Sequence, residues 1–228
     1  MSTPELSQQP SVGLFGGTFN PVHIGHLRLA LEIRQHLQLD EMRLMPCALP
    51  PHRDAPEVAA QHRLAMLQLA VAGEPGLQVD DRELRRAAAH AEARPSYTID
   101  SVAELRTELG PQAVICLCIG MDSLLSLDTW HRWRELLDFV HLVVVARPGW
   151  TAPQSGDVAE WLKQHRIEDA DQLHQQPAGK VWLETLTLLP VSSTEIRHNL
   201  AVGQSVRYLL PEAVIGYISK YKLYARDA

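Results

Sequence analysis

Residues 11–26 read Ser-Val-Gly-Leu-Phe-Gly-Gly-Thr-Phe-Asn-Pro-Val-His-Ile-Gly-His, and the rest of the chain can be interpreted from this stretch. A short apolar strand, Val12 to Phe15, leads through Gly16 and Gly17 into an expected helix. Glycines lack a Cβ, so the backbone can turn tightly there and come close to a ligand. The helix that follows directs unpaired amide N–H groups and the positive end of its dipole at the same space. The stretch therefore predicts a strand–turn–helix unit that suits a triphosphate.

Two histidines, His23 and His26, stand in the expected first turn of that helix. Residues three apart lie on one side of a helix, so both imidazoles are expected to face the same space. A helix N-terminus disfavours protonation of a nearby imidazole. Each ring can therefore act as a neutral hydrogen-bond donor or as a cation supported by bound phosphates.

Other interpretations of this stretch remain open at this point. Glycine-rich turns between a strand and a helix occur in many parallel-sheet proteins, and two histidines can simply be solvated. Zinc is disfavoured, because the stretch offers no third or fourth ligand at a metal-binding spacing. The pattern is neither a dinucleotide-binding Gly-x-Gly-x-x-Gly nor a Walker A loop.

Length and composition indicate one globular unit. The 228 residues can bury one substantial core, so we expect a single domain over residues 1–228, with residues 1–10 flexible. The apolar fraction of 46% with 21% charged residues is ordinary for a globular protein and argues against disorder. A net charge of −6 argues against broad nucleic-acid binding, although a local basic cleft can still hold phosphate.

Membrane and redox signals are weak throughout the sequence. The longest apolar stretches, 113–119 and 142–146, are too short to cross a bilayer, and the first ten residues do not resemble a signal peptide. The cysteine count is odd, and Cys116 and Cys118 fall on one face of a strand-like run, which predicts small core residues. Together these features favour a reducing cytoplasm and no membrane partner.

Hydrophobic spacing predicts strands and helices in alternation. Strands are expected at 12–15, 42–45, 77–79, 113–119, 141–146 and 181–188. Helices are expected from the histidines to about residue 38, across 64–71 and 102–109, in a short stretch around Trp130 and Trp133, after Ser192, and after Pro211. In the last helix Val214, Ile218 and Tyr221 are expected to face inward. This alternation predicts an α/β fold, a doubly wound parallel sheet of Rossmann-like type with helices on both faces. In such sheets ligands bind beyond the carboxyl ends of the strands.

Several polar residues fall at that edge. Gly120 and Asp122 come directly after the most apolar strand, and the proline-stiffened loop 46–53 ends in His52 and Arg53, which can meet an anion or be solvated. Ser96 or Thr98 can cap the helix that follows them. Residues 149–179 can form a lid, an oligomer contact or surface helices, and the sequence does not choose among these.

A second helix start resembles an anion site. Ser192 or Ser193 can cap it, with Glu195 placed for a capping box. Arg197 then lies about one turn into the helix, on the side where an anion at the N-terminus would be. A plain capped helix with a surface arginine explains the same residues.

The full string 16–26 resembles the signature of the nucleotidyltransferases that share a His-x-Gly-His motif, a superfamily that includes class I aminoacyl-tRNA synthetases. Four further segments resemble one branch of it, the nicotinate mononucleotide adenylyltransferases of bacterial NAD biosynthesis: 50–53, 95–98, 120–124 with Trp130, and 192–197. One departure is Asn20, where that family usually has aspartate. It removes a charge beside the phosphate loop and puts a catalytic role at this position in doubt.

The resemblance implies roles for particular residues. It implies an ATP site formed by Gly16, Gly17, Thr18, Phe19, His23, His26, Gly120, Asp122, Ser192, Thr194 and Arg197. It implies a mononucleotide site formed by Tyr97, Thr98, Trp130, Arg53 and Arg147, with the indole stacked on the pyridine ring. His23, His26 and Arg197 would be the catalytic residues, and no residue of the chain is assigned as a metal ligand.

The implied reaction is adenylyl transfer from ATP to nicotinate mononucleotide, giving deamido-NAD and pyrophosphate. No carboxylate cluster for tight metal binding is visible, so Mg²⁺ is expected to be held mainly by the ATP phosphates. Tyr97, Thr98 and Trp130 argue against a phosphopantetheine adenylyltransferase. A synthetase fragment is disfavoured because a Lys-Met-Ser-Lys-Ser-like loop and a tRNA-binding domain are lacking. A non-catalytic nucleotide sensor would not need His23, His26 and Arg197 together. The choice between nicotinate and nicotinamide stays open, and a homo-oligomer is compatible with the sequence.

Overall fold

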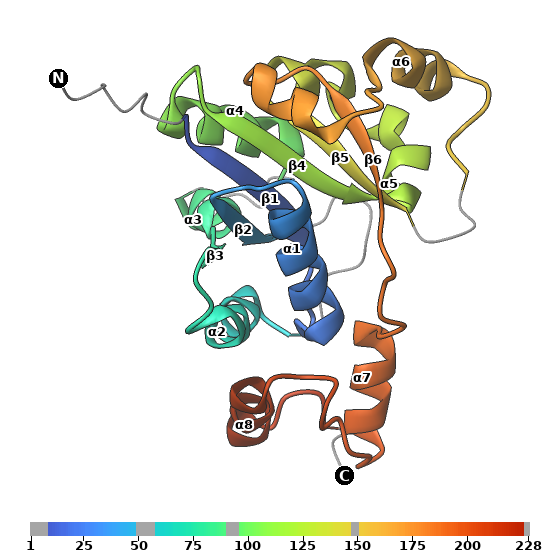
Figure 1. Cartoon of the computed structure of the whole chain (residues 1–228). Helices are drawn as coiled ribbons and strands as arrows, with labels where there is room; N and C mark the ends of the chain where they lie inside the picture. The colour runs from blue at the N-terminus through green and yellow to red at the C-terminus, as the bar shows by residue number, and fades with distance from the viewer. Residues whose placement is uncertain (1–8, 49–57, 90–95, 147–150, 226–228) are drawn as a thin grey trace, which may run out of the picture.

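The computed structural model describes residues 9–48, 58–89, 96–146 and 151–225. Its centre is a six-stranded sheet in the order β3-β2-β1-β4-β5-β6, with every pairing parallel (Figure 1). The strands are β1 (Ser11–Gly17), β2 (Glu41–Pro46), β3 (Leu77–Val79), β4 (Val114–Gly120), β5 (His141–Ala146) and β6 (Val181–Thr185). From β1 the chain adds β2 and β3 on one side and then β4, β5 and β6 on the other, so the strand order switches between β1 and β4. Doubly wound sheets bind their ligands at this switch point.

Helices cover both faces of this sheet, as the sequence predicts. One apolar core is shared by α1 (Ile24–His36), α2 (Ala60–Val71), α7 (Ser193–Ala201) and α8 (Glu212–Tyr221). A second core lies on the opposite face under α4 (Thr98–Leu109), α5 (Met121–Leu125) and α6 (Asp157–His165). Three short 3₁₀ helices complete the chain: η1 (Leu127–Thr129), η2 (Trp133–Asp138) and η3 (Ala170–Gln175).

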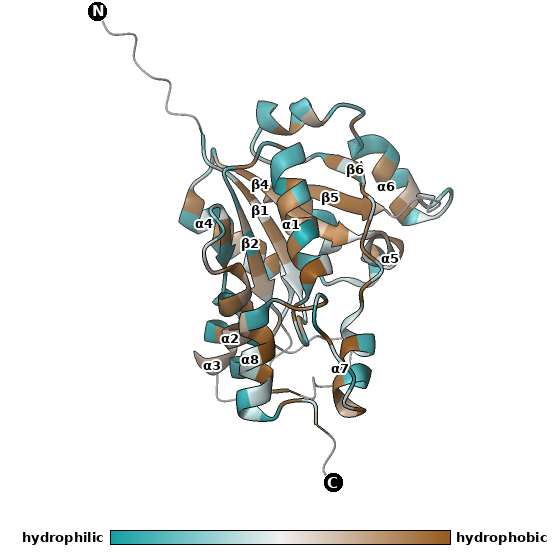
Figure 2. Ribbon diagram, turned by 60° about the horizontal axis from the view of Figure 1, so that its bottom comes forward, coloured by the Kyte–Doolittle hydropathy of each residue, from teal (hydrophilic) through white to brown (hydrophobic). Residues whose placement is uncertain are grey.

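Strand β4 shows why the central strands are apolar along their whole length. Cys116 and Cys118 pack into the first core, whereas Ile115 and Leu117 pack into the second. Because both faces are covered, no position of the strand is left for a polar side chain, and β4 and β5 are largely hydrophobic in Figure 2. The prediction that the two cysteines are small core residues is confirmed.

Some element boundaries differ from the prediction. Strand β6 ends at Thr185 rather than near residue 188, because Thr185 pairs with Ala146, the last residue of β5. Helix α1 ends at His36, and Gln38 beyond it has a φ of 50°. Tyr221 was expected to face inward, but it is 45% exposed and its ring packs at a tilt against that of Tyr217. Val214 and Ile218 are buried as expected.

The caps differ as well. The N-cap of α4 is Tyr97, and neither Ser96 nor Thr98 caps the helix through its side chain. The Ser96 hydroxyl instead accepts a hydrogen bond of 3.0 Å from Arg86. At α7 the prediction of a serine cap is confirmed, since the Ser192 hydroxyl accepts from the Glu195 N–H at 3.2 Å.

The described residues between β5 and β6 form helices at the surface, with α6 anchored in the second core and η3 in the first. Trp161 of α6 is buried and packs edge-on against Trp133, with ring centroids 5.3 Å apart. Trp150 and most of the N-terminal ten residues, 1–8, lie outside the described residues. In the part of the chain that the structure describes, no helix combines the length and apolarity needed to span a bilayer.

Candidate active site

The turn from β1 to α1 brings the two histidines face to face. His23 is the N-cap of α1 and His26 stands three residues later, so the first histidine precedes the helix rather than lying within it. Their rings are stacked, with centroids 3.7 Å apart. The His23 backbone N–H donates to Nδ1 of His26 at 3.3 Å. Nδ1 of His26 is therefore an acceptor, which leaves Nε2 to carry the proton of the neutral ring.

Both histidines are held neutral. Burial lowers the pKa of His23 to about 4. Burial and the adjacent His23 lower the pKa of His26 to about 3. The neutral state that the sequence left as one of two options is thus favoured in the free protein, and burial is its main cause.

Glycines in this turn make room for aromatic rings. A Cβ on Gly25 would lie 3.0 Å from Nδ1 and 3.1 Å from Cε1 of His23. A Cβ on Gly17 would lie 2.9 Å from the ring of Phe19, and Phe19 in turn packs edge-on against His26 with centroids 5.0 Å apart. Gly17 and Gly25 thus leave room for the rings of Phe19 and His23 to pack against the turn, in addition to any approach of a ligand.

The start of α7 docks on this turn. Arg197 donates to the carbonyl oxygen of Asn20 at 2.8 Å and lies 3.4 Å from the Thr194 hydroxyl. Ser193 donates to the carbonyl oxygen of Pro21 at 2.9 Å. The two helix N-termini that the sequence marked for phosphate thus meet at one place, although 170 or more residues separate them in the chain.

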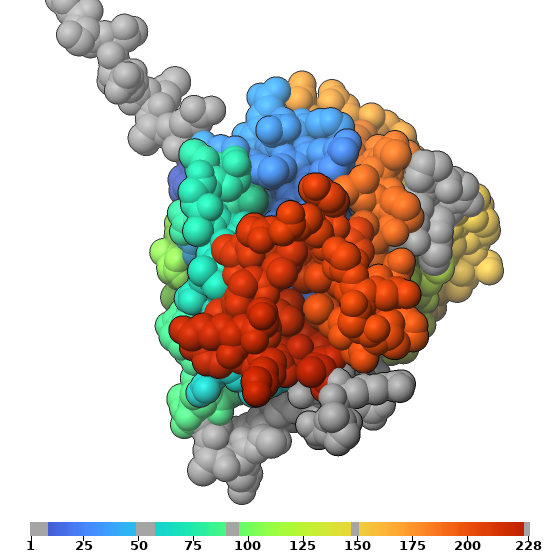
Figure 3. Space-filling view, turned by 90° about the horizontal axis from the view of Figure 1, so that it is seen from below, coloured from blue at the N-terminus to red at the C-terminus, as the bar shows by residue number. Residues whose placement is uncertain are grey.

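Residues after α8 also reach the turn. The Tyr224 hydroxyl donates to Oδ1 of Asn20 at 2.7 Å, and both side chains are buried. Asn20 thus serves as an acceptor, a role that an aspartate can also fill. The segments after β6 lie below the sheet in Figure 1, and in Figure 3 these orange and red residues cover the centre of the face and border both the blue and the teal residues.

The end of β4 borders the same space. Gly120 is the N-cap of α5, and a Cβ at this position would overlap the Asp122 carboxylate. Asp122 itself is exposed in the first turn of α5. Since β1 and β4 are neighbours at the switch point, Gly120 and Asp122 belong to the same sheet edge as Gly16 and Gly17.

Arg63 on α2 lies beneath the turn, and the sequence analysis missed it. Its side chain is 1% exposed and donates to the carbonyl oxygens of Thr18 at 2.7 Å and Cys47 at 2.9 Å. It thereby joins the segments that follow β1 and β2. A signal was present in the sequence, because Arg63 lies on the same helical face as Met66 and Leu67, where a core residue is expected.

The expected mononucleotide side is only partly described. The ring of Tyr97 packs against that of His131 in a tilted arrangement with centroids 4.5 Å apart, which places the start of α4 beside the segment that carries Trp130. His131 was not anticipated. Trp130 is half-buried against the second core, which leaves part of the indole accessible. Arg53, Arg147 and His52 lie outside the described residues.

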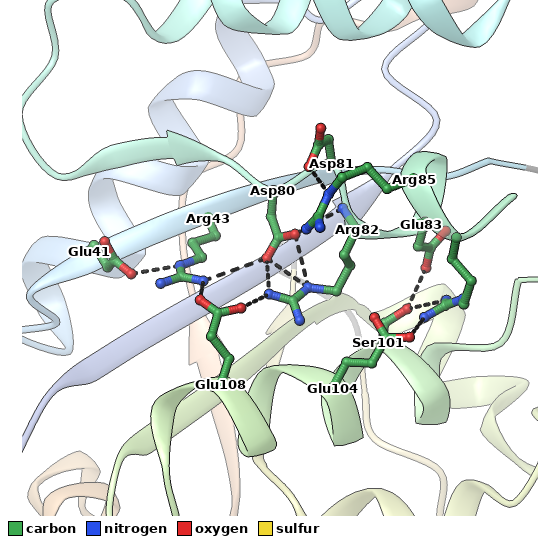
Figure 4. A network of polar contacts seen from close by, with 11 residues as sticks. Glu41, Arg43, Asp80, Asp81, Arg82, Glu83, Arg85, Ser101, Glu104 and Glu108 are labelled. Atoms are coloured by element: carbon green, nitrogen blue, oxygen red, sulfur yellow. Dashed lines mark hydrogen bonds and ion pairs between the residues drawn. The ribbon is translucent and has the colours of Figure 1, made fainter. Parts of the chain in front are cut away.

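A charged network supports this side of the sheet (Figure 4). Buried Asp80 and Arg82 form an ion pair of 2.6 Å, and Glu108 of α4 bonds both Arg82 and Arg43. These hydrogen bonds lower the pKa of Glu108. The network attaches α3 (Arg82–Ala89) to β2 and α4, and α3 escaped prediction because charge pairs rather than an apolar stripe hold it.

The network continues towards the loops of the site. Glu83 accepts from the Ala48 N–H at 3.3 Å and from the Ser101 hydroxyl at 3.1 Å. Arg86 donates to Ser101 and Ser96, and so connects α3 with the segment just before Tyr97. The residues around the loop after β2 and the start of α4 are therefore linked by side-chain hydrogen bonds.

The fold and this turn define a nucleotidyltransferase. The cytidylyltransferase-like family model matches residues 14–199, which run from β1 into α7. Among curated relatives, a probable nicotinate-nucleotide adenylyltransferase of Cellvibrio japonicus is 51% identical over 95% of this chain and 99% of its own. One from Aeromonas salmonicida is 49% identical over 95% of this chain and 98% of its own. The chain belongs to the nicotinate-nucleotide adenylyltransferase family.

Solved structures agree on the fold. The nicotinic acid mononucleotide adenylyltransferase of Plasmodium falciparum, complexed with NaAD, superposes with a TM-score of 0.66 at 16% identity, over 94% of this chain and 97% of its own. A second structure of that enzyme, complexed with APC, gives a TM-score of 0.64.

Proposed function

We propose that this chain transfers the adenylyl group of ATP to nicotinate mononucleotide and releases deamido-NAD and pyrophosphate. Family membership supports the reaction. The observation that carries it to particular residues is the convergence of two helix N-termini and a neutral histidine pair on the turn after β1. Phosphate groups bind well to such unpaired N–H groups.

The chemistry needs alignment more than proton transfer. The attacking mononucleotide phosphate is already an anion, so no general base has to activate it. Two mutually repelling phosphates must be brought together in line, and charge that develops on the pyrophosphate must be stabilised. In the proposal Gly16, Gly17, Thr18 and Phe19 line the nucleotide. Nε2–H of His26 donates to a phosphate oxygen, and His23 contributes from its place in the stack.

The N-terminus of α7 is proposed to bind the outer phosphates of ATP. Ser192, Thr194 and Arg197 are proposed to bind them, because Arg197 already lies against Asn20 in the turn. Gly120 and Asp122 are assigned to the adenosine side or the space between the substrates. Tyr97, Thr98 and Trp130 are proposed to form the mononucleotide site with Arg53 and Arg147.

Mg²⁺ fits this arrangement as a companion of ATP. Within the described ranges, no group of three or more His, Cys, Asp or Glu side chains is arranged to hold a metal ion. Mg²⁺ commonly binds through substrate phosphates with one or two carboxylates, and Asp122 offers one such carboxylate at the sheet edge. The ion would supply positive charge to the triphosphate.

The test measures pyrophosphate release from ATP and Mg²⁺ with three acceptors in parallel: nicotinate mononucleotide, nicotinamide mononucleotide and phosphopantetheine. The proposal predicts a strong preference for the nicotinate substrate. Preference for phosphopantetheine would overturn the substrate assignment. ATP binding without release for any acceptor would point to a nucleotide sensor instead.

A further inference from the structure

Arg63 is a buried arginine whose guanidinium group is only partly hydrogen-bonded. Of the residues the structure describes, two have a buried side-chain nitrogen without a hydrogen-bond partner: His23 at Nδ1 and Arg63 at Nε. Both residues contact the turn after β1. The unsatisfied polar atoms of the described core are thus gathered where the nucleotide is proposed to bind.

The charge of Arg63 also has no partner of opposite sign. Its bonds go to two backbone carbonyl oxygens, those of Thr18 and Cys47, and none of the ion pairs found among the described residues includes it. Among the described residues, Glu83 bonds to the segment next to Cys47, and its carboxylate is occupied by the Ala48 N–H and the Ser101 hydroxyl. A guanidinium keeps its charge at every physiological pH.

An unpaired buried cation is costly. Removing a charge from water costs several kcal/mol unless a counter-charge or a full set of hydrogen bonds replaces the water. The chain does provide such a partner elsewhere, because buried Arg82 is matched by Asp80 and Glu108. At Arg63 the described residues supply none, and the turn that it touches is the one that faces the triphosphate.

We propose that Arg63 is a positioning residue for ATP, which fixes the Thr18 turn from beneath and whose positive charge is compensated by the bound triphosphate. The inference rests on the proposed ATP site and does not depend on the acceptor substrate. It assigns to α2 a part in nucleotide binding, although Arg63 itself is held by carbonyl groups and is too buried to serve as a surface ligand.

Binding measurements on two variants separate charge from structure. Arg63→Lys keeps the charge but loses the forked donor, whereas Arg63→Gln keeps a donor and loses the charge. Calorimetric titration then gives the affinity for ATP, for inorganic tripolyphosphate as the charged part of ATP, and for adenosine as the uncharged part. We expect Arg63→Gln to weaken ATP and tripolyphosphate binding about tenfold or more with adenosine nearly unchanged, and Arg63→Lys to retain most of the affinity.

The matched control is Arg85→Gln, which changes the net charge equally at an exposed arginine of α3. It should leave all three affinities unchanged. Equal losses for ATP and adenosine in both Arg63 variants would overturn the proposal, because they would indicate a purely structural role. If Arg63→Gln does not fold, Arg63→Met, with an unbranched apolar side chain for the buried position, takes its place with the same expected outcomes.

The result is distinguishable from a failure of the proposed reaction. If the wild-type chain binds triphosphate without releasing pyrophosphate, the proposed reaction is wrong. The Arg63 proposal is then still decided by the affinities of the Arg63 variants. No binding of ATP or tripolyphosphate by the wild-type chain would overturn both.

Discussion

Two parts of this molecule bury charged or titratable groups in opposite ways. Beneath β3 and α4, Asp80 and Arg82 are buried as a pair, and Glu108 and Arg43 extend the pairing to the surface. Around the turn after β1, His23 and Arg63 are buried and His26 is partly buried, with no acidic partner for any of them among the described residues. In the first arrangement the charges neutralise one another, and the ion pairs stabilise the fold. In our proposal, a bound anion supplies the counter-charge that the second arrangement lacks.

The largest expected effect is on the unpaired side. His26→Ala should lower turnover about 100- to 1000-fold, the range seen when one donor to a developing charge is removed. The variant should remain folded, since His26 is not a central core residue. Steady-state kinetics with a thermal unfolding curve check both statements. His36→Ala, at the exposed end of the same helix, is the control.

Near-normal turnover in a folded His26→Ala protein would contradict the proposed role of His26 in catalysis, and the difference in function between the two regions would no longer hold.

The paired side should respond in stability instead. Asp80→Ala leaves Arg82 buried with Glu108 as its remaining acidic partner. Breaking a buried pair typically costs 3–5 kcal/mol, and we expect about 3 kcal/mol here because Glu108 is retained. Urea unfolding gives the free energy, and KM for ATP should stay within about twofold of the wild type. A large rise in KM at unchanged stability would show that the network also serves the ATP site.

A smaller change sharpens the role of the histidine stack. Gly25→Ala places a Cβ 3.0 Å from Nδ1 of His23 and should displace that ring. We expect turnover to fall about tenfold, because small misplacements of aligned groups are costly in rate. Gly216→Ala in α8 is the matched control, since a Cβ there meets nothing within 4 Å. It should leave turnover unchanged and stabilise the helix by up to about 1 kcal/mol.

The unpaired side also predicts a pH dependence. The folded pKa values of His23 and His26, about 4 and about 3, lie below the ordinary value of 6.5. Between these values the unfolded chain binds protons that the folded chain resists, so stability is full above pH 6.5 and falls as the pH drops towards 4. His141, whose pKa burial also lowers to about 4, contributes in the same direction.

Unfolding free energies at pH 7 and pH 5 test this for the wild type and for the double variant His23→Gln with His26→Gln. The double variant should lose part of the pH dependence and keep the share that belongs to His141. An unchanged slope would mean that the two rings titrate normally.

The fold could be predicted because its signals are local. Continuous apolar runs gave β4 and β5, the glycine pair gave the end of β1, and alternation of strands and helices gave the doubly wound sheet. Helix α3 was missed because its buried positions, Arg82 and Glu83, are charged and their partners are distant in the chain.

The site was predictable only in part for a related reason. His23 and His26 could be placed on one side of a turn from their spacing alone. Arg63, His131 and Tyr224 could not, because each acts through a contact with a residue that sequence spacing does not bring near, namely Thr18, Tyr97 and Asn20.

The docking of Asn20 against late segments also has a consequence for how the protein is made. Its partners Arg197 and Tyr224 follow it by 177 and 204 residues. Synthesis runs from the N-terminus at about 5–20 residues per second, so β1 and its histidines emerge from the ribosome many seconds before these partners do. A growing chain can therefore assemble most of the sheet first, and the turn after β1 gains these two contacts only after Arg197 and Tyr224 have been synthesised.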